Sequence, residues 1–194
     1  MEQPEKLWLA EYRAGNTSAL DKLVEHYRRP LYGFILRMTE GRDDAEEIFQ
    51  EVWFRAIRKL DSYKSKKFLS WLFRIAHNLI IDRVRKRKPD HSLQEQYNDE
   101  GLSLEERIES PGLDPADKTG DLDLGRRIKA AVLELPDEQR EVFLMRTEAN
   151  LPFKDIAKIQ GTSINTALAR MQYALTKLRE HLKEDYLAIA RARQ

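Results

Sequence analysis

The chain has 194 residues, of which 41% are hydrophobic and 35% are charged, and its net charge is +1 at neutral pH. This composition suits one ordinary domain or two small ones and excludes a disordered chain. Only 8 glycines and 7 prolines are present, which favours helices over a turn-rich β fold. The sequence contains no cysteine, so disulfides and thiolate chemistry are excluded, and a reducing cytoplasm is a suitable location.

Four helices are predicted in the first part of the chain, because apolar residues recur there every three or four positions. They cover residues 7–12, 20–38, 45–60 and 68–88. Residues 15–18 interrupt the pattern and offer side chains that can cap the second helix. Pro30 lies inside that helix and predicts a kink or a break there. We interpret residues 5–88 as one helical domain.

The next segment, residues 89–123, changes character. It carries 11 acidic residues against Arg107 and Lys118, together with three prolines and three glycines. Its apolar content is low, which predicts an extended acidic linker rather than part of a core.

A second helical unit follows over residues 124–187. Its predicted helices are one that Pro136 ends, one that Asp137 caps, a short one over 153–160 and a last one over 163–187. The predicted fold is therefore all-α, with two small helical domains joined by the acidic linker.

The end of this unit has the pattern of a helix-turn-helix. A short helix meets a turn at residues 161–163, and the next helix begins with short polar side chains. The side chains that could reach base edges or phosphates are Ser163, Asn165, Thr166, Arg170, Gln172 and Tyr173, with Lys177 and Arg179 further along for the backbone. The alternative is a plain three-helix bundle with a solvated face.

Residues 55–88 are strongly basic, with twelve Lys and Arg against Asp61 and Asp82. Such segregation under a near-zero net charge predicts a face for a polyanion. Aromatic residues are interleaved: Phe54, Tyr63, Phe68, Trp71 and Phe73. Cations and flat rings together are what single-stranded nucleic acid binding requires. The alternative places Phe68, Trp71 and Phe73 in the core and leaves the basic end of the helix in solvent.

The third predicted helix has a polar, mostly acidic face opposite its apolar stripe, formed by Glu46, Glu47, Gln50 and Glu51. This face is either a surface for a basic partner or simply solvated. The paired carboxylates have no Glu-x-x-His companion, and the sequence lacks the common phosphate-binding, metalloprotease, hydrolase and dinucleotide-binding motifs. We therefore predict no catalytic residue, no metal site and no cofactor.

The sequence predicts neither a signal peptide nor a membrane-spanning segment. The first residues lack a basic start followed by an apolar run, so no signal peptide is predicted. The most apolar stretch, residues 68–84, is interrupted by charged side chains, so no membrane insertion is expected.

Three strings resemble a known family. Residues 44–53 (DAEEIFQEVW) resemble the polymerase-clamp-binding helix of bacterial sigma factors. Residues 68–86 (FLSWLFRIAHNLIIDRVRK) are similar to the segment of extracytoplasmic-function (ECF) sigma factors that melts and reads the −10 promoter element. Residues 133–143 (LELPDEQREVF) resemble the start of the domain that reads the −35 element.

This resemblance implies a role for each segment. Residues 5–88 would be a region 2-like domain and 124–187 a region 4-like domain. The implied core-polymerase-binding residues are Glu47, Gln50 and Glu51. The implied −10 DNA-binding residues are Lys64, Ser65, Lys66, Lys67, Phe68, Trp71, Asn78, Asp82, Arg83, Arg85, Lys86 and Arg87. The implied −35 DNA-binding residues are Thr162, Ser163, Asn165, Thr166, Leu168, Arg170, Gln172, Tyr173 and Lys177.

One string departs from the family pattern. Many members carry Thr-Val-Lys-Ser-Arg in the recognition helix, whereas residues 166–170 here read TALAR. Leu168 and Ala169 thus stand where a cation and a hydroxyl are usual. Leu168 is expected either to contact a thymine methyl group or to be buried.

The resemblance predicts a non-enzymatic, cytoplasmic sigma factor that binds core RNA polymerase and recognises a two-part promoter. The implied partners are the clamp of the largest polymerase subunit, the flap region and promoter DNA in double-stranded and melted form. Members are often held inactive by an anti-sigma factor. Two other functions remain open: a stand-alone helix-turn-helix regulator, and an adaptor that binds a protein through its acidic face.

Overall fold

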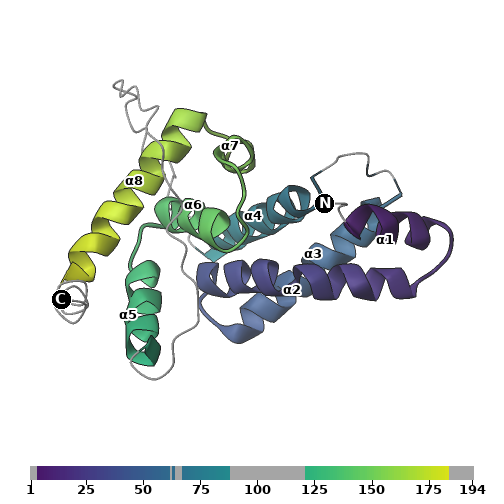
Figure 1. Ribbon diagram of the computed structural model, residues 1–194, viewed down its shortest axis with the longest axis horizontal. Coiled ribbons are helices and arrows are strands. Elements are labelled where there is room, and N and C mark those ends of the chain that lie inside the picture. Colours follow the sequence, from purple (N-terminus) through teal and green to yellow (C-terminus); the bar gives the residue numbers. More distant parts are fainter. Residues whose placement is uncertain (1–3, 62, 64–66, 88–120, 184–194) are drawn as a thin grey trace, which may run out of the picture.

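The structure, a computed structural model, describes residues 4–61, 63, 67–87 and 121–183. Within these residues it contains eight α-helices and no β-strand (Figure 1). The all-α prediction is therefore confirmed. The predicted linker lies mostly outside the described residues, and its last three positions already belong to the first helix of the second unit.

The first helical unit consists of four helices. They are α1 (Pro4–Arg13), α2 (Ser18–Met38), α3 (Arg42–Lys59) and α4 (Phe68–Arg87). The helices α2, α3 and α4 pack on one another, and α1 packs on α2. Phe34 of α2 and Phe73 of α4 are fully buried, with ring centroids 4.9 Å apart. Burying such a side chain stabilises the fold by about 1.5–3 kcal/mol, so this contact holds α4 against α2.

A cluster of aromatic rings fixes the beginning of α4. Phe68, the first residue of the helix, is only 1% exposed. Its ring centroid lies 5.3–6.4 Å from those of Tyr27, Trp53, Tyr63 and Trp71. Tilted and edge-on rings at this spacing attract one another beyond their burial of area. The start of α4 is therefore set by core packing, although it follows a basic loop in the sequence.

The short helix α1 is tied to the rest of the unit at both ends. Burial raises the pKa of the Tyr27 phenol, and the nearby Glu5 carboxylate, which is hydrogen-bonded to it, raises that pKa further. At the other end, the Arg13 guanidinium donates to the carbonyl oxygens of Leu60 at 3.1 Å and Tyr63 at 2.6 Å. The Leu60 carbonyl lies at the end of α3, where carbonyls have no partner within the helix, and Tyr63 belongs to the loop that follows. Arg13 binds both and so holds the end of α3 together with this loop.

The second helical unit is built around its last helix. Its members are α5 (Asp121–Leu133), α6 (Asp137–Thr147), α7 (Phe153–Gln160) and α8 (Ile164–His181). The helix α8 contacts each of the other three. Ile156 of α7 and Met171 of α8 are buried at this junction, together with Leu144 of α6.

The predicted helix-turn-helix is present as α7, a turn at residues 161–163 and α8. Gly161 ends α7 in the left-handed conformation, with φ of +66°, which side chains other than hydrogen disfavour. Ser163 then begins α8, because its hydroxyl accepts a hydrogen bond of 3.0 Å from the backbone N–H of Thr166. These two residues set the angle between α7 and α8.

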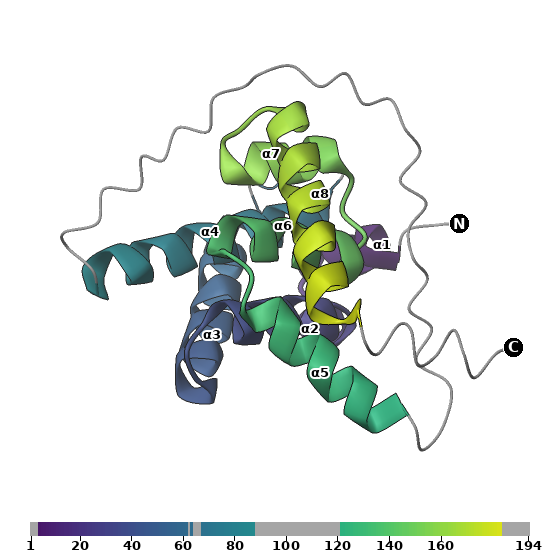
Figure 2. The same cartoon turned by 90° about the vertical axis from the view of Figure 1, so that its left-hand side faces the viewer.

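The two units are packed against each other. The helix α7 contacts α4, and α6 contacts α2; in Figures 1 and 2 the helices α6 and α7 lie beside α4 in both views. Buried apolar side chains of the two units join into one continuous cluster. The domains predicted from the sequence are thus in direct contact in this structure.

The structure lacks two predicted local features, a break of α2 at Pro30 and a cap of α6 by Asp137. The helix α2 continues through Pro30 without a break, because Tyr27 and Leu31 on either side of it are buried in the same core. Packing on both sides compensates for the backbone hydrogen bond that proline cannot make. Asp137 does not cap α6: it is the first helical residue and follows Pro136, and its carboxylate pairs with Arg140.

The same substitution at two glycines should have opposite effects on stability. Gly161→Ala introduces a side chain at positive φ and should destabilise the protein by roughly 1–2 kcal/mol. Gly125 lies inside α5 with no neighbouring atom within 4 Å of an added Cβ, so Gly125→Ala should stabilise by roughly 0.5–1 kcal/mol. Urea unfolding of the two variants measures both values. Shifts of the same sign would contradict the backbone argument.

Candidate nucleic-acid and polymerase interfaces

The polar face of α3 is open to solvent. Glu46 and Gln50 are exposed, and the side chain of Glu47 is 70% exposed. Glu51 is half-buried and pairs with Arg55, one turn further along, at 2.6 Å. The opposite face of α3 is buried in the core, so the helix presents carboxylates on one side only. This arrangement suits a basic partner, as the sequence predicts.

Arg83 of α4 joins this face to the rest of the unit. Its guanidinium lies 2.5 Å from a carboxylate oxygen of Asp44 and 2.9 Å from one of Glu47. The hydrogen bond to Glu47, together with the charge of Asp44, raises the pKa of Arg83. Arg83, predicted to face DNA, therefore bridges α4 to α3 and pairs with Glu47, which is itself a predicted polymerase contact.

Several residues of α4 that are predicted to bind DNA are accessible to solvent. The side chains of Asn78, Asp82, Arg85 and Lys86 are exposed, and Trp71 is half-buried against the core. Lys64, Ser65, Lys66 and the side chain of Arg87 lie outside the described residues. Phe68 is a correction: it is enclosed by other rings in the core, so we do not include it in a DNA surface.

Lys67 stands at the beginning of α4, but its ammonium group is engaged by the second unit. It donates to both carboxylate oxygens of Asp155, each at 2.7 Å. Sequence reasoning missed the neighbouring contacts of Ser70, Arg74 and His77 with the same unit. Their spacing of three and four residues was the available signal, since it places them on one face of the helix.

The start of α8 presents several of the predicted −35 residues. Asn165, Tyr173 and Lys177 are exposed. Ser163 and Thr166 are joined by hydrogen bonds that cap the helix. The partly exposed members are Thr162, Leu168 and Gln172.

Arg170 is directed into its own domain rather than away from it. Its guanidinium pairs with the Glu138 carboxylate and donates to the Gln160 side-chain oxygen at 3.0 Å. Arg170 thereby ties α8 to α6 and α7. In this structure its role is structural, and sequence reasoning, which placed it on a DNA-facing surface, had no signal for these partners.

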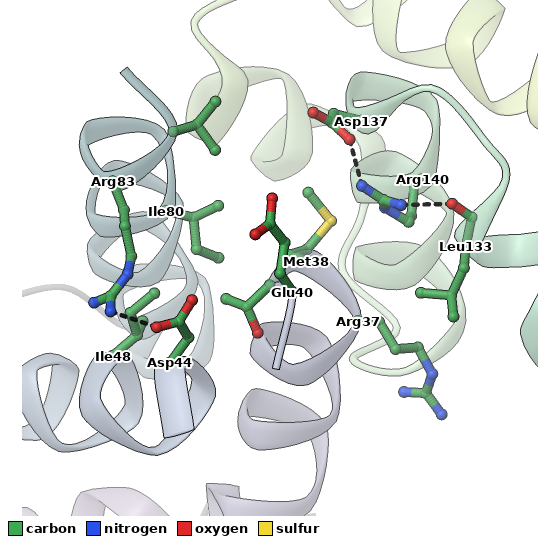
Figure 3. A pocket seen from close by; sticks show the side chains of 12 residues that line it. Arg37, Met38, Glu40, Asp44, Ile48, Ile80, Arg83, Leu133, Asp137 and Arg140 are labelled. Carbon is green, nitrogen blue, oxygen red and sulfur yellow. Dashed lines mark hydrogen bonds and ion pairs between the residues drawn. The ribbon is translucent and has the colours of Figure 1, made fainter. Parts of the chain in front are cut away.

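A cleft of about 210 Å³ opens between the two units. Figure 3 shows Asp44 and Arg83 on one side of it and Asp137 with Arg140 on the other. Ile80 of α4 lines its wall, one turn beyond His77, which contacts Glu141 of α6.

Among the described residues, no group of three or more His, Asp or Glu side chains is arranged to hold a metal ion. None of the helices in the described part of the chain is long and apolar enough to cross a membrane.

The fold and these surfaces define a class: an all-helical protein with a helix-turn-helix in one unit and adjoining acidic and basic surfaces in the other. Residues 23–89 match the family Sigma-70 region 2, and residues 125–178 match the family Sigma-70, region 4. These two stretches follow the two helical units in order.

Two similar proteins belong to the same group as these family matches. The chain is 33% identical to the ECF RNA polymerase sigma factor SigW of Bacillus subtilis over 186 residues, which is 95% of this chain and all of that protein. It is 28% identical to the ECF RNA polymerase sigma factor SigM of the same organism, over 86% of this chain and 94% of SigM.

Two solved structures share the fold. One is the sigma factor RpoE of Bartonella quintana in complex with the anti-sigma factor NepR, with a TM-score of 0.62, 24% identity, and coverage of 84% of this chain and 96% of that one. The other is CnrH in complex with the cytosolic domain of CnrY, with a TM-score of 0.65, 21% identity, and coverage of 94% and 99%.

The chain belongs to the ECF RNA polymerase sigma factors. Proteins of this family bind core RNA polymerase and promoter DNA and direct promoter-specific initiation, and they are not enzymes. Membership favours this function over the stand-alone regulator and the protein adaptor.

Arg83 and Arg85 offer a matched test of the bridge between α4 and α3. Arg83→Met removes a charged partner of the half-buried Asp44, so we expect the free energy of unfolding to fall by roughly 1–2 kcal/mol. Arg85 is exposed, and Arg85→Met should change that free energy by less than about 0.5 kcal/mol. Thermal and urea unfolding measure both variants. Equal losses would contradict the bridge.

Proposed function

We propose that the first helical unit reads and melts the −10 promoter element through α4, and that the second reads the −35 element through α8. The α3 face of Glu47, Gln50 and Glu51 binds the clamp of the largest polymerase subunit. The observation that carries this proposal is the layout of the first unit: the exposed acidic face of α3 and the exposed polar residues of α4 adjoin at Arg83.

The physical basis of melting is the capture of an unpaired base. Turning a base out of the duplex costs a few kcal/mol, which stacking and hydrogen bonds to the base edge must offset. Asn78 and Asp82, both exposed on α4, supply donors and acceptors for base edges. Arg85 and Lys86 follow at the end of the helix and can neutralise phosphates.

Double-stranded −35 DNA is read by side chains at the start of α8. Asn165 can bond the edge of an adenine in the major groove, and Leu168 can contact a thymine methyl group. Lys177 lies further along α8, where contact with a phosphate positions the helix without selecting sequence. Base reading by this unit rests on fewer polar side chains than the family pattern supplies, because residues 168 and 169 are Leu and Ala.

The acidic segment 89–123 would follow the basic path that holds nucleic acid near the polymerase active centre, its carboxylates standing in for phosphates. The second unit would bind the flap region. A cytoplasmic location follows from these partners. An anti-sigma factor is a further partner, supported by the two fold relatives, whose structures are complexes with another protein.

Charge reversal on α3 should weaken association with core polymerase. Glu47→Lys combined with Glu51→Lys turns attraction to a basic partner into repulsion, so affinity for core polymerase should fall at least about tenfold. Gel filtration with purified core polymerase measures it. The control, Glu25→Lys with Glu180→Lys, makes the same change in net charge on other exposed helix faces and should bind normally. Equal binding by both variants would reject the α3 surface.

Run-off transcription from a promoter library tests the proposed readout. Promoter-specific transcripts should appear only when the protein is added to core polymerase. Asn165→Ala should relax the preference at one −35 position, whereas Lys177→Ala should weaken all promoters alike. Binding of polymerase without promoter-specific transcripts would reject the −10 and −35 roles. An unchanged preference in Asn165→Ala would reject base reading by that residue.

A further inference from the structure

Two apolar side chains at the beginning of α8 lie outside the core. Ile164, the first residue of the helix, is 45% exposed, and Leu168 is partly exposed. Among the described residues, neither side chain is buried in the apolar core or packed against it. We call Ile164 and Leu168 the α8 apolar pair. Because they are four residues apart, they are neighbours on one face of the helix.

The buried face of α8 is formed by other residues, which are Ala167, Met171, Ala174 and Leu178. At about 100° per residue, Leu168 lies about 90° away from the centre of this buried stripe and about 40° from Gln172. Asn165 follows Ile164 directly and is exposed. The α8 apolar pair therefore lies beside the polar side chains that are proposed to meet base edges.

The place of the pair in the fold selects its partner. In a helix-turn-helix, the second helix enters the major groove, and the residues of its first turns contact base edges. Ile164 and Leu168 occupy those turns, and proteins of this family bind promoter DNA. The base edges in the major groove carry hydrogen-bond donors and acceptors, and the C5 methyl group of thymine is their apolar group. Thymine is thus the base that an aliphatic side chain recognises there.

Reading of bases by hydrogen bonds is reduced in this part of α8. The Arg170 guanidinium is engaged by Glu138 and Gln160 within the second unit. The side chains of Leu168 and Ala169 contain no donor or acceptor. Apolar contact must therefore supply a larger share of the discrimination between bases at this place in the groove.

The spacing of the α8 apolar pair limits the spacing of the thymines that it contacts. Four residues of an α-helix rise by about 6 Å, and successive base pairs of a duplex are about 3.4 Å apart. The two side chains therefore reach methyl groups that lie one or two base steps apart, on either strand.

We propose that the α8 apolar pair reads the methyl groups of two thymines, one or two base steps apart, in the −35 element of the promoters that this protein recognises. The inference rests on the proposed −35 role of α8 and names the base chemistry that this helix selects. Ile164, which the sequence patterns did not single out, is thereby a specificity-determining residue. Burial of one methyl group changes an affinity by about fourfold, so the pair discriminates by roughly fifteenfold.

Deoxyuridine isolates the methyl group, because it differs from thymidine by that group alone. In the test, holoenzyme assembled from core polymerase and this protein binds a promoter selected from the run-off library, and each −35 thymine is replaced in turn. Replacement at two positions, one or two base pairs apart, should each lower the affinity about fourfold, as measured by fluorescence anisotropy of labelled promoter DNA. Unchanged affinity at every −35 thymine, or a selected element without thymines at this spacing, would overturn the proposal.

Alanine variants assign each methyl group to one side chain. Ile164→Ala and Leu168→Ala should each lose the sensitivity to deoxyuridine at one of the two positions and keep it at the other, as in a double-mutant cycle. Leu7→Ala is the matched control, because Leu7 of α1 is likewise an exposed aliphatic residue, at 61%, and this variant should keep both sensitivities. Circular dichroism checks that each variant is helical. Equal sensitivity in the wild type and in both α8 variants would contradict the assignment.

Leu168→Lys gives a readout that a purely structural role of Leu168 would not change. The lysine removes the methyl contact and adds a cation close to the phosphates. Sensitivity to deoxyuridine at one position should therefore disappear, while the slope of log affinity against log salt concentration should steepen by about one. Retained sensitivity to deoxyuridine would overturn the role of Leu168.

Three results separate this proposal from the proposed function. A −35 preference that does not respond to deoxyuridine would overturn the methyl contacts and leave the −35 role of α8 in place. The absence of any −35 preference would overturn both. Weaker binding of Ile164→Ala and Leu168→Ala to core polymerase without DNA would assign the pair to a protein contact and overturn its assignment to thymine.

Discussion

The rest of the structure depends on how α4 is buried. One face of the helix, with Phe68, Leu72 and Phe73, fills the core of the first unit, and the aromatic rings around Phe68 fix where the helix begins. Once this face is buried, the remaining faces are set by the geometry of a helix. One of them carries Lys67, Ser70, Arg74 and His77, which contact the second unit. A neighbouring face carries Asn78 and Asp82, and Arg83 reaches back to α3. A shift of the buried face would move all three surfaces together.

The surfaces of the first unit are connected through few charged groups. Arg83 joins α4 to Asp44 and Glu47 on α3, so a residue beside the proposed DNA face also contacts the proposed polymerase face. Lys67 similarly belongs to the proposed DNA face and to the contact with Asp155. The same cation can thus be neutralised by a carboxylate of the chain or by a phosphate of DNA. Binding of one partner therefore changes the affinity for the other. The reason is that the free-energy cost of burying a carboxylate depends on whether a cation is paired with it.

In the second unit, the geometry of the helix-turn-helix is held by residues other than those proposed to read DNA. Gly161 and Ser163 set the turn, and Arg170 ties α8 to Glu138 and Gln160. None of these roles depends on the residues at 168 and 169, where Leu and Ala replace the usual polar pair. The scaffold and the proposed DNA-reading surface of this unit are thus carried by different side chains.

The sequence by itself determined the helical class, the helix-turn-helix, the acidic face of α3 and the family, because these depend on local spacing, turn chemistry and short motifs. It could not decide whether Pro30 breaks α2, since that depends on the core on both sides of the proline. Nor could it predict that Phe68 is enclosed, that Arg170 turns toward Glu138, or that Lys67 and His77 meet Asp155 and Glu141. Those partners lie 64 to 88 positions away in the chain for the last two contacts. Only the tertiary structure brings them together, since no local pattern records which distant carboxylate will neutralise a given cation.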